Sequence, residues 1–248
     1  MYATMSLKEQ VKERVRELSR YLGIEVRRNG VNVRPDLRFQ RFLQGHSIQT
    51  IVDVGASRGQ FAIETLARGF TGEIVSFEAL PGVHLELQEH AKQFKDRWTV
   101  APRTALGREH GVTAFHVTRN RQSSSLLVPS SDLQRMSANL EQTEVIEVPC
   151  TTLDRFFPNT DELGRFVLKL DVQGAEMSVL EGGLNTLSAC SGVLIELSLV
   201  PLYEGQPLAS DLDSFLRSEG FSAWDIIPFY RAPESGRLLQ YDAIYFRE

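Results

Sequence analysis

The sequence contains only two cysteines, Cys150 and Cys190, among its 248 residues. Two thiols cannot build a disulfide framework or a four-thiolate metal site. The chain also lacks any apolar run near the roughly 18 residues that a membrane-spanning helix needs. Its first residues become charged before a secretory signal could form. We therefore predict a cytoplasmic protein without stable membrane insertion.

The composition, with 42% hydrophobic and 24% charged residues, is that of an ordinary globular chain. The net charge of −5 is unevenly distributed, because residues 1–50 carry ten Lys and Arg against five Asp and Glu. This basic segment could meet an anionic substrate, a partner or a membrane surface, although a solvated helix face is the simpler explanation. No basic stripe with interleaved aromatic residues follows it, so nucleic-acid binding is not expected.

Residues 1–49 are predicted to form a helical and extended segment ahead of the main domain. Ser6 and Glu9 make a capping box for a helix that reaches about Leu22, and apolar residues recur along one face of it. Asn29-Gly30 predicts a turn, and a second short helix is expected from about Leu37 to Gln44. The apolar face must pack on the main domain or on a second subunit, so a homodimer is one of the two alternatives.

From residue 50 the pattern changes to strands that alternate with helices. Strands are predicted at 50–54, 73–77, 98–101, 166–171, 192–197, 222–227 and 239–246, with helices at 59–68, 81–94, 175–187 and 209–218. Two further β-like pieces are expected at 112–118 and 144–149. This alternation predicts an α/β domain over residues 50–248 with a mostly parallel sheet. A short loop joins the last two strands, so the final strand should be antiparallel, and the ligand should bind at the carboxyl ends of the strands.

The loop from Asp53 to Gly59 leaves the first of these strands and opens a helix. Its glycines are spaced Gly-x-x-x-Gly, unlike the Gly-x-Gly-x-x-Gly of dinucleotide sites, and a carboxylate precedes them. A carboxylate disfavours a phosphate and suits a ligand that carries an ammonium and a sulfonium, which favours S-adenosylmethionine over NAD. Glu78 ends the next strand, where an acidic residue can accept hydrogen bonds from ribose hydroxyls.

Asp171 ends another apolar strand in the segment Lys169 to Glu176, so its carboxylate should face the same cleft as Asp53. Glu176 is either a first-turn charge at the following helix or a functional group. Glu196 is a charged residue within an apolar strand, and such a carboxylate is costly to bury without a partner. Neither the histidines nor the cysteines show metal or nucleophile spacing. An all-oxygen Mg²⁺ site from Asp171, Glu196 and Asp242 is the less favoured alternative, so no metal is predicted.

These motifs together resemble the FkbM family of S-adenosylmethionine-dependent methyltransferases over about residues 50–246. The resemblance rests on the order and spacing of several short segments: Asp53 to Gly59, Glu78, Thr104 to Gly107, Ser123 to Leu126, Thr152 to Asp154, Leu170 to Glu176 and Glu196 to Gly205. It implies a class I methyltransferase fold, which is Rossmann-like and has a seven-stranded sheet with a reversed last strand. The family often has Glu where this chain has Gln173, which leaves the role of that position open.

The resemblance also implies roles for individual residues. Asp53, Gly55 and Ala56 would hold the methionine portion of the cofactor, Glu78 the ribose and Thr104-Ala105 the adenine edge. The predicted cofactor site is completed by three further loop residues and by the strand-end carboxylate: Ser57, Gly59, Ala79 and Asp171. Asp171 is the predicted base or acceptor-orienting group, with Glu196 as its competitor. Substrate contacts are predicted for Lys169, Gln173, Ser124 and Ser125.

The predicted activity is methyl transfer from S-adenosylmethionine to a hydroxyl of a small-molecule or glycan acceptor, such as a sugar, a glycolipid or a secondary metabolite. Two alternatives remain at this stage. One is an NAD-dependent oxidoreductase of Rossmann type, and the other is a catalytically inactive module that kept the cofactor pocket. The residues alone do not identify the acceptor.

Overall fold

The computed structural model describes residues 6–22 and 34–247, and it divides into two units, Met1–Arg41 and Phe42–Glu248. The first unit contains α1 (Leu7–Tyr21), which begins with the predicted capping box. The Ser6 amide donates to Glu9 Oε2 at 2.9 Å, and the Glu9 amide donates to Ser6 Oγ at 3.4 Å. The side chains of Val11, Val15, Leu18 and Leu22 are exposed. The predicted turn at Asn29-Gly30 lies outside the described residues.

The helix α2 (Pro35–Gly45) confirms the second predicted helix, and the division between the two units falls within it. The predicted domain boundary lies further along, between residues 49 and 50. The last part of α2 belongs to the second unit and packs on its aromatic residues. The Phe42 ring lies 5.5 Å from the Trp224 ring, and the His46 ring stacks on Phe246 at 4.0 Å between centroids.

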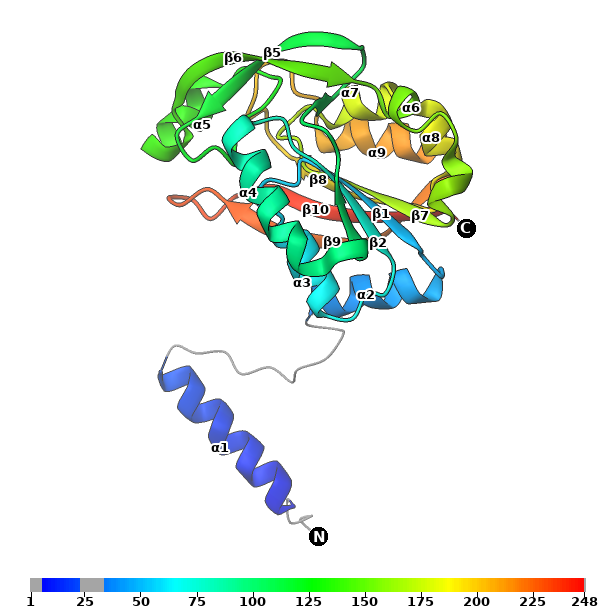
Figure 1. Cartoon of the computed structure of the whole chain (residues 1–248). Helices are drawn as coiled ribbons and strands as arrows, with labels where there is room; N and C mark the ends of the chain where they lie inside the picture. The colour runs from blue at the N-terminus through cyan, green and yellow to red at the C-terminus, as the bar shows by residue number, and fades with distance from the viewer. Residues whose placement is uncertain (1–5, 23–33, 248) are drawn as a thin grey trace. The chain divides into compact units, whose positions relative to one another are not determined.

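A seven-stranded sheet forms the centre of the second unit, in the order β3-β2-β1-β7-β8-β10-β9 (Figure 1). Its strands are β1 (Thr50–Val54), β2 (Glu73–Phe77), β3 (Trp98–Val100), β7 (Phe166–Leu170), β8 (Gly192–Ser198), β9 (Phe221–Arg231) and β10 (Leu238–Arg247). The first five of these in spatial order are parallel, whereas β10 runs antiparallel between β8 and β9. The reversed last strand therefore confirms the predicted α/β class I methyltransferase fold.

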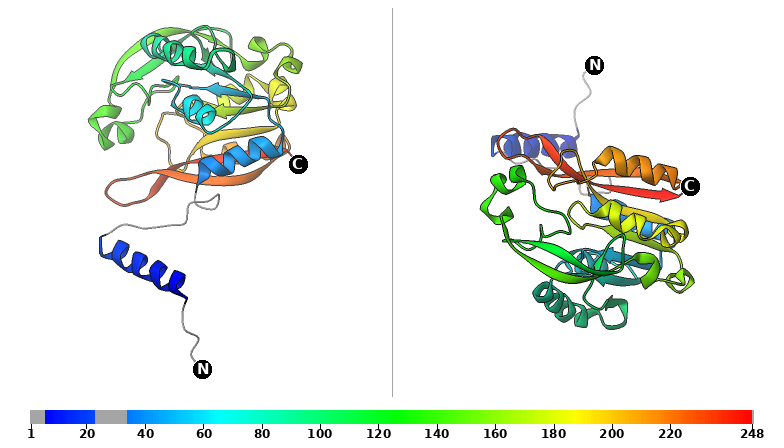
Figure 2. Two further views of the ribbon diagram at one scale, coloured as in Figure 1. Left: turned by 60° about the horizontal axis from the view of Figure 1, so that its bottom comes forward. Right: turned by 90° about the horizontal axis from the view of Figure 1, so that it is seen from above.

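Helices cover both faces of this sheet, as the two views of Figure 2 show. One face carries α3 (Gln60–Ala67) and α4 (Pro81–Ala91), which is followed by the 3₁₀ helix η1 (Lys92–Arg97). The other carries α7 (Glu176–Glu181), α8 (Leu184–Ala189) and α9 (Ala209–Ser218). Alternate strand residues such as Val52, Leu168 and Ile195 pack with Leu180 and Leu212 of these helices in the largest hydrophobic core. Burial of this apolar surface stabilises the sheet between its two helical layers.

The predicted helix over residues 175–187 is interrupted, because two glycines separate α7 from α8. A Cβ atom at Gly182 would lie 2.1 Å from the Gly107 carbonyl oxygen, and one at Gly183 would lie 2.7 Å from Leu153. Only glycine allows these close approaches. The break is therefore set by contacts with segments distant in sequence, which helical periodicity alone does not show.

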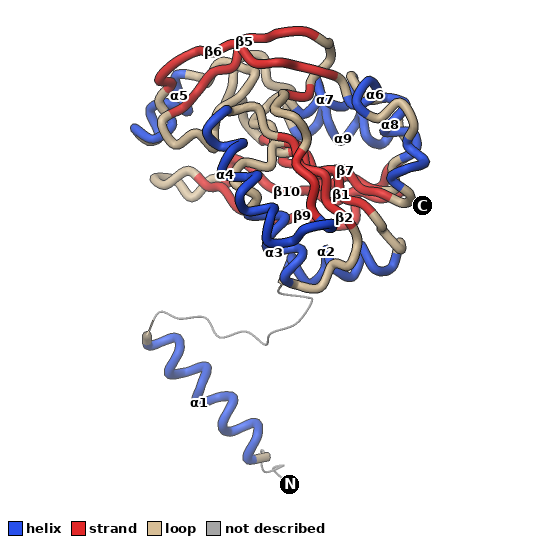
Figure 3. Tube along the Cα trace, viewed as in Figure 1, coloured by secondary structure: helices blue, strands red, loops and turns tan. Residues whose placement is uncertain are grey.

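A second, three-stranded sheet confirms the two predicted β-like pieces and adds a strand that the sequence pattern did not indicate. It contains β4 (Ala105–Leu106), β6 (Gln142–Thr151) and β5 (Gly111–Thr118), in that spatial order. Between β5 and β6 lie α5 (Ser131–Met136) and η2 (Ala138–Leu140), and after β6 come α6 (Leu153–Phe156) and η3 (Thr160–Leu163) (Figure 3). Phe115, Val117 and Val148 of this sheet pack on Leu80 and Val83. The sheet therefore covers the loop that follows β2.

None of the helices described in residues 6–22 and 34–247 combines the length and the apolar character that a membrane crossing requires.

Candidate active site

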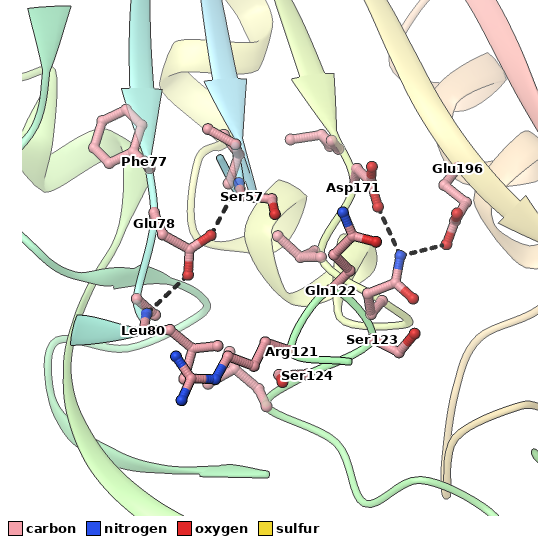
Figure 4. Close-up of a pocket in the computed structure, with 18 of the residues that line it drawn as sticks. Ser57, Phe77, Glu78, Leu80, Arg121, Gln122, Ser123, Ser124, Asp171 and Glu196 are labelled. Atoms are coloured by element: carbon pink, nitrogen blue, oxygen red, sulfur yellow. Dashed lines mark hydrogen bonds between the residues drawn. The ribbon is translucent and has the colours of Figure 1, made fainter. Parts of the chain in front are cut away.

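A cavity of about 600 Å³ opens at the carboxyl ends of β1, β2 and β7 (Figure 4). Its volume lies within the usual range for small-molecule sites. The strand ends and the loops after them bring most of the predicted cofactor residues to its wall: Gly55, Ala56, Ser57, Glu78, Ala79, Thr104, Ala105 and Asp171. The location predicted for the ligand, at the carboxyl ends of parallel strands, thus coincides with this cavity.

The loop after β1 is shaped by Gly55, which has a φ of 77°. A Cβ atom there would lie 1.9 Å from the Asp171 carbonyl oxygen, so the two loops approach more closely than any other residue permits. Two residues later, the Ser57 amide donates to Glu78 Oε2 at 3.0 Å. The glycine loop, the end of β2 and the end of β7 are therefore joined into one wall of the cavity.

Asp53 lies elsewhere than its predicted role requires. Its side chain is fully buried and does not line the cavity. Asp53 Oδ2 accepts a hydrogen bond from Ser76 Oγ at 3.0 Å, and Asp53 Oδ1 lies 3.1 Å from the ammonium of Lys169. The Asp53 carboxylate therefore pairs with an ammonium of the protein, that of Lys169, in place of the ammonium of a cofactor. The strand alternation explains the difference: Val52 and Val54 pack in the core with α7 and α9, so Asp53 points to the opposite face, where it meets Ser76 and Lys169.

Gly59 also differs from its predicted role at the ligand, because it packs on an aromatic ring. It has a φ of 84°, and a Cβ atom there would lie 2.3 Å from the Trp98 side chain. Gly59 is absent from the cavity wall. The close approach that was predicted for this glycine exists, but the neighbour is Trp98 of β3.

Glu78 points into the cavity from the end of β2 (Figure 4). Its Oε1 accepts from the Leu80 amide at 2.8 Å, and its Oε2 accepts from the Ser57 amide. Burial raises the pKa of Glu78, and these amide hydrogen bonds oppose the rise. A carboxylate has about four acceptor positions, so Glu78 can accept further hydrogen bonds from a ligand in the cavity. Nearby, Thr104 is buried at the cavity wall, where its hydroxyl donates to the Ala105 carbonyl oxygen at 3.0 Å.

The second half of the cavity is built around Gln173, whose amide joins two carboxyl groups (Figure 4). Gln173 Nε2 donates to Asp171 Oδ1 at 2.7 Å and to Glu196 Oε2 at 3.1 Å. The Tyr203 hydroxyl lies 2.8 Å from the Ser123 carbonyl oxygen and 3.1 Å from Gln173 Oε1, and the amide of Gln173 turns its nitrogen toward both carboxyl groups. Gln240 Nε2 donates to Glu196 Oε2 at 2.7 Å. The structure therefore brings the two predicted catalytic residues together and gives Gln173 a bridging position.

The other predicted substrate residues have different surroundings. The Lys169 ammonium lies at the cavity wall, but Asp53, Asp171 at 3.5 Å and the Gly55 carbonyl oxygen at 3.2 Å surround it. Burial opposes its charge, yet the nearby carboxylates outweigh burial and raise the pKa of Lys169. Ser124 lines the cavity, whereas the Ser125 hydroxyl lies outside that wall and donates to the Gln173 carbonyl oxygen at 2.8 Å. Ser125 therefore holds the loop around Gln173.

Glu176 is fully buried and stabilises the same loop. Its Oε1 accepts from the amides of Val172 at 3.0 Å and Gly174 at 3.2 Å. Burial raises the pKa of Glu176 to about 7. Of its two alternatives, the structure supports the charge at the first turn of α7.

A further carboxyl group lies beside Glu196. It belongs to Asp242 of β10, which is the register partner of Glu196 on β8. Burial, together with the charge of Asp171, raises the pKa of Glu196 well above its ordinary range and that of Asp242 to about 7. Within residues 6–22 and 34–247, no cluster of His, Cys, Asp and Glu side chains has the arrangement of a metal site.

We expect Asp242→Asn to stabilise the protein at alkaline pH. The pKa of Asp242 is about 7 in the folded state and 3.8 in the unfolded state, so protonation of Asp242 favours the folded state. This contribution to the free energy of unfolding is fully present below pH 4 and is lost as the pH rises through 7. Asn cannot titrate, so the variant should gain roughly 1–2 kcal/mol at pH 8 after allowance for partial solvent access, and little at pH 4. Urea unfolding at the two pH values measures this difference. The exposed Asp161→Asn is the control, and an equal gain from it would contradict the prediction.

Sequence reasoning missed Tyr203 and Gln240. Tyr203 lies in a loop after β8, within a segment that carries the family resemblance. Its position was therefore a weak indication that it belongs to the site. Gln240 reaches Glu196 from the antiparallel strand β10, 44 positions further along the chain. Only the register of β10 against β8 places it there, and that register has no local sequence signal.

Comparison with known proteins identifies the family. The model of the methyltransferase FkbM domain matches residues 53–223. A curated protein of Beauveria bassiana (strain ARSEF 2860), Methyltransferase 1, is 25% identical over 194 residues, which cover 74% of this chain and 76% of that protein. The family match confirms the predicted methyltransferase class and does not support the alternative of an NAD-dependent oxidoreductase.

Solved structures show lower similarity. A Streptococcus pneumoniae protein in complex with S-adenosyl-L-methionine is 13% identical, with a TM-score of 0.47 and coverage of 85% of this chain and 72% of that one. The methyltransferase domain of bacterial CtHen1-C is 8% identical, with a TM-score of 0.44 and coverage of 88% and 99%. The fold class is therefore established by the strand order, and the family by the domain match. The chain belongs to the FkbM family of methyltransferases, which confirms S-adenosylmethionine as its predicted cofactor.

Proposed function

We propose that this protein transfers the methyl group of S-adenosylmethionine to a hydroxyl of a sugar, glycolipid or secondary metabolite. The observation that carries the proposal is the Gln173 bridge, because it aims two carboxyl groups into the same cavity as the glycine loop and Glu78. The cofactor, when bound, supplies an activated methyl group on a sulfonium. The protein must then position a hydroxyl and accept its proton.

The cavity wall fits this cofactor in its shape and in its acceptors. Glu78 keeps acceptor capacity for the ribose hydroxyls, and Gly55 and Ala56 expose backbone without side-chain bulk for the methionine portion. Thr104 and Ala105 line the wall where the adenine edge is proposed. Asp53 has no cofactor contact in this proposal, because its side chain pairs with Lys169 and lies outside the cavity wall.

Asp171 is the proposed base or acceptor-orienting group. It keeps a direct opening to the cavity while Gln173 fixes one of its oxygens. Positioning of a hydroxyl and removal of its proton by a fixed carboxylate together supply several kcal/mol to such a reaction. Glu196 is the weaker candidate, because burial raises its pKa and it already accepts from two amide groups.

Transfer of a labelled methyl group tests this proposal. Full-length protein is incubated with labelled S-adenosylmethionine and a panel of glycosides, glycolipids and hydroxylated metabolites. Incorporation into a hydroxyl supports the proposal. Binding of S-adenosylhomocysteine without transfer to any acceptor would favour the inactive-module alternative, and methylation only at nitrogen or carbon would contradict O-methylation.

Glu78→Gln should weaken S-adenosylhomocysteine binding by about tenfold, because a charged acceptor for the ribose hydroxyls is lost. Isothermal titration calorimetry measures the change. Glu73→Gln is the matched control, since Glu73 is exposed at the opposite end of the same strand β2. Equal affinities of the Glu78 variant and the unmodified protein would exclude Glu78 from ribose binding.

A further inference from the structure

The end of the cavity that contains Asp171 is also lined by five large apolar side chains, which we call the apolar wall. They come from α5, η2, the loop after β8, and β9: Leu133, Leu140, Leu202, Phe229 and Tyr230. Leu133 and Leu202 form a small hydrophobic core with Tyr203, against which Leu140 and Tyr230 pack. The Tyr203 hydroxyl bonds to Gln173, and Gln173 bonds to Asp171. The apolar wall is therefore connected to the proposed catalytic carboxylate through two side chains, those of Tyr203 and Gln173.

The mouth of this region keeps an aromatic residue half exposed. Phe229 retains 50% of its accessible surface although it lines the cavity. Ile226 of the same strand is similarly exposed, at 56%, and does not line the cavity. Exposed apolar surface at a cavity mouth is typical of ligand sites, and Ile226 gives an internal comparison for it.

Acidic side chains outnumber basic ones at the end of the cavity that contains Asp171. Asp171, Glu196 and Asp242 present three carboxyl groups to the cavity, against the single ammonium of Lys169. That ammonium is also neutralised from behind by the buried Asp53. Arg121 lies at the other end, beside the start of α4, because a Cβ atom at Gly82 would be 3.2 Å from its Nη1. A phosphate or carboxylate at the apolar wall would therefore meet three carboxyl groups, and the Lys169 ammonium there already pairs with Asp53 and Asp171.

We propose that the acceptor is an uncharged molecule with both a hydroxyl and a sizeable apolar portion, and that the apolar portion binds against the apolar wall. The proposal rests on the proposed methyl transfer and narrows its substrate class. The carboxyl and amide groups bind the hydroxylated part, while the wall removes the apolar part from water. Free sugars lack the apolar portion, and sugar nucleotides carry the wrong charge.

Three simple probes separate these requirements: n-octyl β-D-glucopyranoside below its micelle concentration, D-glucose and n-octyl phosphate. Each is titrated by ligand-observed NMR into the full chain saturated with S-adenosylhomocysteine. We expect the octyl glucoside to bind at least about tenfold more tightly than glucose, because only it covers the wall. Octyl phosphate should bind at least about fivefold more weakly than the octyl glucoside.

Variants show whether binding occurs at the wall. Phe229→Ser and Leu140→Ser should each weaken octyl glucoside binding by about fivefold or more, while Ile226→Ser should leave it unchanged. Asp242→Asn should increase the affinity for octyl phosphate, because it removes one carboxylate. Circular dichroism and calorimetric binding of S-adenosylhomocysteine establish that each variant is folded.

The outcomes distinguish this inference from the proposed function. Equal affinity for glucose and octyl glucoside, tighter binding of octyl phosphate, or equal losses in Phe229→Ser and Ile226→Ser would each overturn the inference while cofactor binding persists. If S-adenosylhomocysteine itself fails to bind the unmodified protein, the proposed function falls first.

Discussion

Replacement of Asp171 by Asn should reduce methyl transfer by at least about a hundredfold while S-adenosylhomocysteine affinity changes only a few-fold. Asn keeps the size of the side chain and one oxygen for the Gln173 amide, which donates to Asp171 Oδ1 at 2.7 Å. It loses the charge of the carboxylate, including the second oxygen, which lies 3.5 Å from the Lys169 ammonium. The loss should appear in kcat, measured with an acceptor found in the methyl-transfer screen.

Two comparisons show whether the loss comes from Asp171 itself. Asp161→Asn changes an exposed carboxylate of η3 and should leave turnover unchanged. Glu196→Gln keeps the amide contacts possible and should reduce turnover less than Asp171→Asn does. A collapse of S-adenosylhomocysteine affinity in Asp171→Asn would assign this carboxylate to the cofactor site. Glu196 would then become the leading candidate for the base.

Local patterns predicted the sheet because its central strands are short and buried on both faces. Thr50–Val54 and Phe166–Leu170 are buried throughout, and such apolar runs stand out in a sequence. The alternation with helices then determined the parallel arrangement, and the short loop before β10 determined the reversed last strand. The break between α7 and α8 could not be predicted in this way, since it depends on the approach of Gly107.

Site residues that end a strand could be predicted from the sequence. Residues whose side-chain direction depends on the surrounding packing were harder to predict. Glu78 and Asp171 follow their strands and enter the cavity, as expected. Asp53 is inside β1, and strand alternation turns it to the face that carries Lys169 and Ser76. The apolar wall comes from four separate segments of the chain. Tertiary packing brings them together, and no spacing in the sequence shows it.

The largest stability effect is expected for Lys169→Met, which removes the only cation beside a fully buried carboxylate among the described residues. Asp53 Oδ1 has no hydrogen-bond partner there, although it lies 3.1 Å from the Lys169 ammonium. Distance alone therefore supports a charge interaction without hydrogen-bond geometry. Loss of one partner from such a buried pair costs about 3–5 kcal/mol, because the remaining charge is left uncompensated.

Urea unfolding at neutral pH measures this loss, as the difference in the free energy of unfolding between the variant and the unmodified protein.

A double variant separates the charge from the shape of the lysine. Asp53→Asn combined with Lys169→Met removes both charges and keeps an acceptor for Ser76, so it should recover most of the lost stability. Lys92→Met is the matched control, because Lys92 pairs with Glu89 at the surface and should change stability by no more than about 0.5 kcal/mol. If Lys169→Met costs less than about 1 kcal/mol, the ion pair does not hold Asp53 in the sheet.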